Sequence, residues 1–98
     1  MTIETMPFDP AEFIDTPEAQ AELLDEAMAS ADPAFIAAAL GVIARARGMT
    51  RVAREAGVSR ESLYRALSAD GDPRLTTLLG VVKALGLQLK LVPASPAE

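Results

Sequence analysis

Residues Met49 to Leu67 read MTRVAREAGVSRESLYRAL, and this stretch decides the fold of the chain. It contains two short helical segments, 51–56 and 60–67, which are separated by Gly57-Val58-Ser59. Glycine reaches the positive φ angle that a tight turn needs, and serine is a strong N-cap for the second segment. Two short helices joined by such a turn are typical of a helix-turn-helix motif.

The second helix of such a motif lies in the major groove of DNA, with its first residues toward the bases. We expect Thr50 and Ser59 to cap the two helices, whose free amides add donors for phosphate. Arginine on the outward face can bond guanine, glutamate can bond cytosine, and tyrosine can contact a thymine methyl. The predicted DNA-binding residues are Thr50, Arg51, Arg54, Ser59, Arg60, Glu61, Tyr64 and Arg65. The alternative is an ordinary helical hairpin with a solvated arginine face, in which Glu61 pairs with Arg65.

Charge is distributed unevenly along the 98 residues, whose net charge is −5. Residues 1–40 carry nine acids and no base, whereas residues 41–98 carry nine bases and five acids. The two parts therefore have net charges of −9 and +4, which sum to −5. Six arginines and two glutamates give residues 45–65 a net charge of +4. A basic segment within an acidic chain favours a surface for double-stranded DNA.

Histidine, cysteine and tryptophan are absent from the chain. Their absence argues against serine–histidine and cysteine–histidine catalysis, against zinc sites of the usual kind, and against disulfides. The acids near the amino terminus have no base nearby that would perturb them. We therefore expect no enzyme, no catalytic residue, no cofactor, no metal and no small-molecule substrate.

Prolines that follow good N-cap residues mark further helices, because proline suits the first helical position. The pairs are Asp9-Pro10, Thr16-Pro17, Asp32-Pro33 and Asp72-Pro73. They predict helices over 17–30, 33–46 and 73–85. The last of these is expected to bury Leu75, Leu78, Leu79, Val82 and Leu85. The fold class is therefore expected to be all-α, a bundle of about five helices.

Residues 33–92 resemble the Xre/lambda-repressor-like helix-turn-helix class. The run ALGVIARARGMTRVAREAGVSRESLYRALSADGDPRLTTLLGVVKALGLQL, residues 39–89, resembles the addiction-module antidote family. This resemblance implies a HigA-like antitoxin of a type II toxin–antitoxin pair. Such an antitoxin neutralises a RelE/HigB-type toxin by direct binding and represses its own operon by binding operator DNA through the helix-turn-helix.

A toxin that handles RNA presents basic residues to phosphates, so the acidic amino-terminal part is predicted to compete for that surface. Aromatic residues among the acids would serve as apolar anchors. The predicted toxin-binding residues are Phe8, Glu12, Phe13, Asp15, Glu18 and Glu22. The alternative is that residues 17–30 dock on the chain's own core. Two other functions stay open, namely a phage-type repressor without a toxin and a helical adaptor that never binds DNA.

After Gly86, the sequence Leu87-Gln88-Leu89-Lys90-Leu91 alternates apolar and polar residues, which predicts a short β-strand over 87–92. Helix-turn-helix proteins usually act as dimers on palindromic sites. Leu87, Leu89 and Leu91 are therefore predicted to pair across the two-fold axis of a homodimer. The alternative is that the strand adds to a sheet edge of the toxin.

Three parts are expected along the chain. Residues 1–31 form an acidic N-terminal arm with an amphipathic helix, residues 32–92 form the helix-turn-helix domain with its strand, and residues 93–98 form a frayed tail. The amino terminus begins with acids where a secretory signal needs bases. The longest uncharged run falls well short of the about 20 residues of a membrane-spanning helix. We therefore expect a cytoplasmic protein with no membrane contact.

Overall fold

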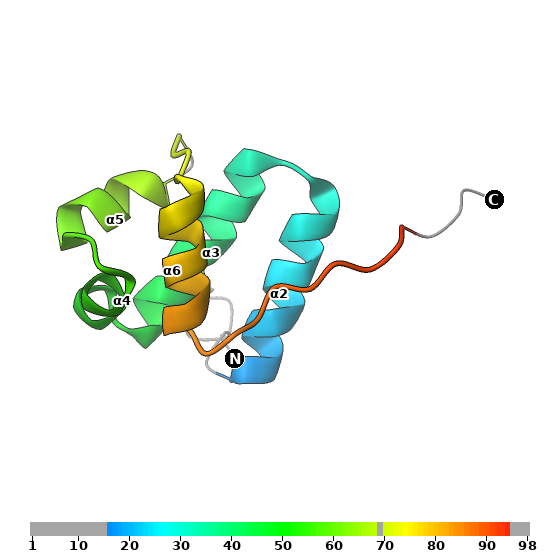
Figure 1. The fold of residues 1–98 in the computed structure, drawn as a ribbon, viewed down its shortest axis with the longest axis horizontal. Helices are drawn as coiled ribbons and strands as arrows, with labels where there is room; N and C mark the ends of the chain where they lie inside the picture. The colour runs from blue at the N-terminus through cyan, green and yellow to red at the C-terminus, as the bar shows by residue number, and fades with distance from the viewer. Residues whose placement is uncertain (1–15, 69, 95–98) are drawn as a thin grey trace, which may run out of the picture.

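The computed structural model describes residues 16–68 and 70–94, in which the chain forms five α-helices and no strand. The helices are α2 (Pro17–Ser30), α3 (Pro33–Arg47), α4 (Met49–Ala56), α5 (Arg60–Ala66) and α6 (Leu75–Ala84) (Figure 1). The prediction of an all-α chain with about five helices is confirmed for this part of the molecule.

Two of the proline-marked helix starts are confirmed by their caps. The Thr16 hydroxyl accepts a hydrogen bond from the Ala19 amide at 3.1 Å, and α2 begins at Pro17. The Asp32 carboxylate accepts one from the Ala34 amide at 3.0 Å, and α3 begins at Pro33. Asp9-Pro10 lies outside the described residues.

The predicted start at Asp72-Pro73 is wrong, because α6 begins two residues later at Leu75. The residues before it are used in the turn that returns the chain from α5. Gly71 donates a hydrogen bond to the Ser68 carbonyl at 2.8 Å and lies against the end of α5, where a side chain would collide with the Ala66 carbonyl.

Helix α3 lies at the centre of the fold, where it packs against both α2 and α4. Helix α4 in turn packs against α5 and α6, so the core lies between these elements. The largest fully buried apolar side chains are Leu40, Ile43, Val52, Leu63, Val81 and Leu85. Leu24 and Ala27 of α2 also belong to this core. Helix α2, which carries exposed acids, is therefore docked on the rest of the described chain.

The buried face of α6 differs from the prediction. Val81, Val82 and Leu85 are buried, but Leu75 and Leu79 are exposed. Gly80 explains the difference, because a Cβ there would lie 3.1 Å from the carbonyl oxygen of Ala56 in α4. The close approach of α4 at Gly80 turns the side that carries the valines inward.

The predicted β-strand over 87–92 is not found in the described residues. Gly86 has a φ of 72° and ends α6, after which the Leu87 amide donates to the Val82 carbonyl at 3.1 Å. The chain then runs on without regular secondary structure as far as residue 94. A strand requires a second extended segment to pair with, and residues 16–68 and 70–94 contain none.

Candidate nucleic-acid interface

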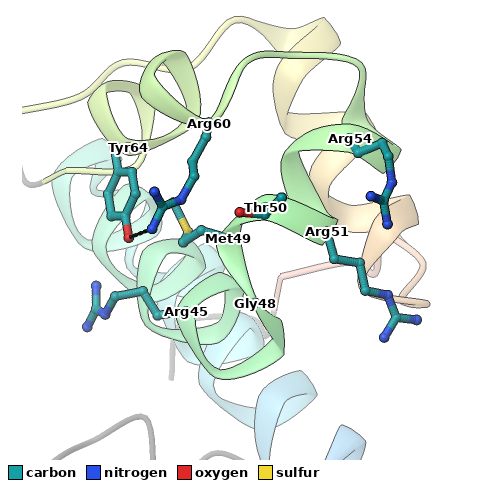
Figure 2. A pocket seen from close by; sticks show the side chains of 8 residues that line it. All are labelled: Arg45, Gly48, Met49, Thr50, Arg51, Arg54, Arg60 and Tyr64. Carbon is teal, nitrogen blue, oxygen red and sulfur yellow. Dashed lines mark hydrogen bonds between the residues drawn. The ribbon is translucent and has the colours of Figure 1, made fainter.

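A surface hollow of about 540 Å³ opens at the start of α4, between the end of α3 and the outer face of α5 (Figure 2). We call it the basic hollow. Its lining residues are Arg45, Gly48, Met49, Thr50, Arg51, Arg54, Arg60 and Tyr64. Four of these eight are arginines, and none is acidic. The hollow therefore concentrates positive charge on an acidic protein, which attracts anions.

Arg60 and Tyr64 lie one helical turn apart on α5 and contact each other at one side of the hollow (Figure 2). The Arg60 Nη2 atom donates to the Tyr64 hydroxyl at 3.3 Å, and the guanidinium carbon lies 5.1 Å from the centre of the ring. This distance fits a cation–π contact. The pair restrains the arginine before any ligand arrives, which lowers the entropy cost of binding.

The start of α4 forms the floor of the hollow and differs from the prediction for Thr50. Gly48, with a φ of 106°, is the N-cap, and α4 begins at Met49 without a side-chain cap. Thr50 is exposed within the first helical turn and does not cap it. Because no side chain occupies this end, its amides and the positive end of the helix dipole are available to an anion beside the arginines.

The turn before α5 is formed as predicted. Gly57 has a φ of 78°, and the Ser59 hydroxyl accepts a hydrogen bond from the Ser62 amide at 3.0 Å. Ser59 therefore acts as the cap of α5 and does not line the hollow. Glu61 and Arg65 are exposed on α5, also outside the hollow, and no ion pair joins them within the described chain.

Arg51 and Arg54 project from α4 on the side of the hollow away from Tyr64 (Figure 2). Arg51 is paired with Glu55, with 3.4 Å between Nε and Oε2, and both side chains are exposed. An exposed pair of this kind contributes about 0.3–0.5 kcal/mol. It is weak enough for a phosphate to displace.

Arg47 does not belong to the basic surface, although its charge was counted there in the sequence. Its Nε and Nη2 atoms donate to Oε1 of Gln20 at 3.0 and 2.8 Å, and Nη2 also donates to the Leu85 carbonyl at 3.0 Å. Gln20 is buried on α2. This guanidinium therefore joins α2, α3 and the end of α6 inside the protein.

The predicted toxin-binding residues fall into two groups. Phe8, Glu12, Phe13 and Asp15 lie outside the described residues. Glu18 and Glu22 are exposed on α2, which lies on the other side of α3 and α6 from α4 and α5 (Figure 1). The structure thus keeps these two acids apart from the basic hollow.

Three lining residues were absent from the predicted site, namely Arg45, Gly48 and Met49. Arg45 was visible as a member of the arginine cluster, but its position in another helix hid that it reaches the same hollow. Gly48 and Met49 carry no charge and gave no signal.

No described helix has both the length and the apolar character that crossing a bilayer requires.

The model of a family described as "Probable addiction module antidote protein" matches residues 4–93. A protein of Haemophilus influenzae described as "Uncharacterized protein" is 44% identical over 91 residues. That match covers 93% of this chain and 94% of the relative. No solved structure matches the chain.

Proposed function

Because the chain belongs to the family of probable addiction module antidote proteins, we propose that it is a HigA-like antitoxin of a type II toxin–antitoxin pair. It binds and neutralises a basic RelE/HigB-type toxin, and as a homodimer it represses its own operon through sequence-specific binding to operator DNA. Its action consists of binding in the cytoplasm, without catalysis or cofactor.

The observation that carries the DNA-binding part is the basic hollow. Arginines from three helices, α3, α4 and α5, surround the uncapped start of α4 with no acid among the lining residues. Phosphate contacts from arginines and helix amides supply most of the affinity of such proteins. In the helix-turn-helix interpretation of α4 and α5, the side chains of Arg60, Tyr64 and Arg65 also face the bases and recognise the DNA sequence.

The antidote part is supported by the family and by α2. Its exposed acids, Glu18, Glu22, Asp25 and Glu26, carry four negative charges at fixed positions on the far side of the fold. A basic toxin finds there a surface of opposite charge, which speeds association and suppresses like-charged partners. The antitoxin therefore offers two surfaces of opposite sign to two partners.

The decisive experiment measures binding of the full chain to a duplex from the promoter region of its own operon. We expect Arg60→Ala and Arg45→Ala each to weaken binding by about 1–3 kcal/mol if a bidentate contact is lost, or about 5- to 150-fold. Each substitution lowers the slope of log affinity against log salt by about 1 if the contact is to phosphate. Toxin neutralisation should stay unchanged in both variants.

Lys83→Ala is the matched control, because Lys83 is exposed on α6 outside the hollow and its loss removes the same charge. Equal affinity of all three variants would show that the hollow is not the DNA surface. A flat salt response of the native chain would favour the adaptor. Operator binding without a neutralised toxin would favour the phage-type repressor.

A further inference from the structure

The segment that follows α6, whose leucines were predicted above to pair in a homodimer, exposes several large apolar side chains. We call residues 87–92 the tail segment. Leu89 is 43% exposed, Val92 is 76% exposed and Leu91 is fully exposed, whereas Leu87 packs partly buried against the core. Single exposed leucines are ordinary, but three large apolar residues within four positions indicate a contact surface.

Residues 88–92 of the tail segment have no backbone hydrogen-bond partner among residues 16–68 and 70–94. The last backbone hydrogen bond is the one from the Leu87 amide to Val82, and none joins residues 88–94 to another described residue. Figure 1 shows this segment passing α2 and leaving the body of the molecule. An extended segment with free amides and carbonyls is a ready template for β-pairing.

The tail segment is complementary to itself. Its sequence Leu-Gln-Leu-Lys-Leu, residues 87–91, has the same apolar and polar pattern in both directions about Leu89. Antiparallel pairing centred on Leu89 brings the two Leu89 residues together and sets Leu87 of one copy opposite Leu91 of the other. The second face then pairs Gln88 with Lys90, so no like charges are opposed.

Two neighbouring registers lack this match. A centre at Lys90 sets the two ammonium groups directly opposite each other, which destabilises the pair. A slip that sets Leu89 opposite Lys90 puts leucines and lysines on one face, because side chains alternate between faces. A foreign sheet edge would not require a palindromic pattern, so the symmetry points to a second copy of this chain.

A groove of about 490 Å³ beside the tail segment extends the contact. Leu24 and Met28 of α2 and Val82 of α6 give it an apolar lining, and Glu22 and Asp25 contribute its acids. Leucines of a second copy that pair along the tail lie next to this lining, where they bury further apolar area. Asp25 suits Lys90 of either copy.

We propose that two copies of this chain dimerise by antiparallel pairing of their tail segments, with the two-fold axis at Leu89. This inference deepens the proposed function and rests on it, because binding to a palindromic operator requires a dimer. The predicted strand thus forms in the dimer, where each tail supplies the pairing partner that residues 16–68 and 70–94 of a single chain lack.

Disulfide mapping tests the register directly, because the chain contains no cysteine. Directly opposed residues have Cα atoms about 4.5–5.5 Å apart, which a disulfide spans. In a glutathione redox buffer, we expect Leu89→Cys to give at least about tenfold more covalent dimer than Leu91→Cys, because only Leu89 meets its own counterpart within disulfide range. A mixture of Leu87→Cys and Leu91→Cys should form the mixed disulfide and little of either self-disulfide.

Light scattering of the full chain provides the second measurement. The native protein should have the mass of a dimer and Leu89→Asp that of a monomer, while Leu75→Asp, which changes an exposed leucine of α6, should remain dimeric. A monomeric native chain, or equal cross-linking at 89 and 91, would overturn the inference. Equal cross-linking leaves the proposed function standing if DNA and toxin still bind. A monomeric native chain would also remove the homodimer from the proposed function, but toxin neutralisation and DNA binding would stand if both are still measured. Loss of operator binding in a tail-paired dimer would overturn the proposed function alone.

Discussion

Arg47 joins three helices through one guanidinium group. The hydrogen bonds to Gln20 and to the Leu85 carbonyl lie inside the protein, where the partner atoms have little access to water. Arginine suits this position because its planar fork reaches two acceptors at once, which the single ammonium of lysine does not reproduce. One residue thus fixes the acidic helix to the rest of the described chain.

Arg47→Ala is expected to lower the free energy of unfolding by about 2–3 kcal/mol, because the hydrogen bonds that Arg47 donates to the buried Gln20 side chain and to the Leu85 carbonyl are lost. Arg47→Lys should recover little of this loss. Urea unfolding followed by circular dichroism measures the change.

Arg45→Ala is the matched control, since Arg45 is exposed two residues earlier on the same helix. It should change stability by no more than about 0.5 kcal/mol. Similar losses for Arg45→Ala and Arg47→Ala would contradict the role assigned to the buried network.

Helix α3 lies very close to the end of α5 at Gly41. A Cβ at this position would lie 2.7 Å from the Leu67 carbonyl oxygen, which belongs to the backbone and cannot rotate away. The two helices therefore need glycine at the contact. Because α5 carries Arg60 and Tyr64, this contact also positions one side of the basic hollow.

Gly41→Ala should destabilise the fold by about 1–3 kcal/mol through overpacking, although alanine is the better helix former by about 1 kcal/mol. The added methyl group would push α5 away from α3, and this shift of α5 should also weaken operator binding. Thermal unfolding and a DNA titration measure both effects.

Gly80→Ala is the comparison, because its Cβ would lie at 3.1 Å from the Ala56 carbonyl oxygen and needs a smaller adjustment. We expect a smaller loss of stability there. If Gly41→Ala were as stable as the native protein, the close contact between α3 and α5 would not hold.

Elements whose ends depend on neighbouring residues were predictable from the sequence. The caps Thr16 and Asp32, each followed by proline, placed the starts of α2 and α3 at the observed residues. Gly57 and Ser59 likewise placed the turn and the start of α5. In each case a hydrogen bond or a φ angle within a few residues determines the structure.

Features that depend on contacts between distant segments were not predictable. Arg47 was counted as a surface charge because its acceptor, Gln20, lies 27 residues away. The inner face of α6 was misjudged because glycine is needed at position 80 only where α4 comes close, and the sequence does not show that approach. Arg45 reaches the basic hollow from α3, a helix that the motif between 49 and 67 does not include.

Positive and negative charges lie on different sides of the described molecule. Arginines gather around the start of α4, whereas exposed acids line α2 on the other side of the central helices. Helix α2 is held there by Leu24 and Ala27 in the core and by the Arg47 network. Helix α2 therefore presents its charges from a fixed position, and on the proposed function DNA and toxin have separate surfaces.

This arrangement decides how the toxin surface is to be tested. Deleting residues 1–30 would remove Leu24 and Ala27 from the core, so a loss of neutralisation would report unfolding. Point substitutions avoid this problem because Glu18 and Glu22 are exposed. The matched control is Asp70→Asn with Asp72→Asn, which changes net charge equally in an exposed turn away from α2.

On the proposed function, Glu18→Gln with Glu22→Gln should slow association with the toxin about three- to tenfold at low salt, because steering by opposite charge is weakened. The difference from the native chain should shrink at high salt, where exposed charges are screened. Stopped-flow or surface binding kinetics measure the rates, and operator affinity should stay constant. If the control pair slows association equally, net charge rather than α2 guides the toxin; if neither pair has an effect, the toxin binds elsewhere.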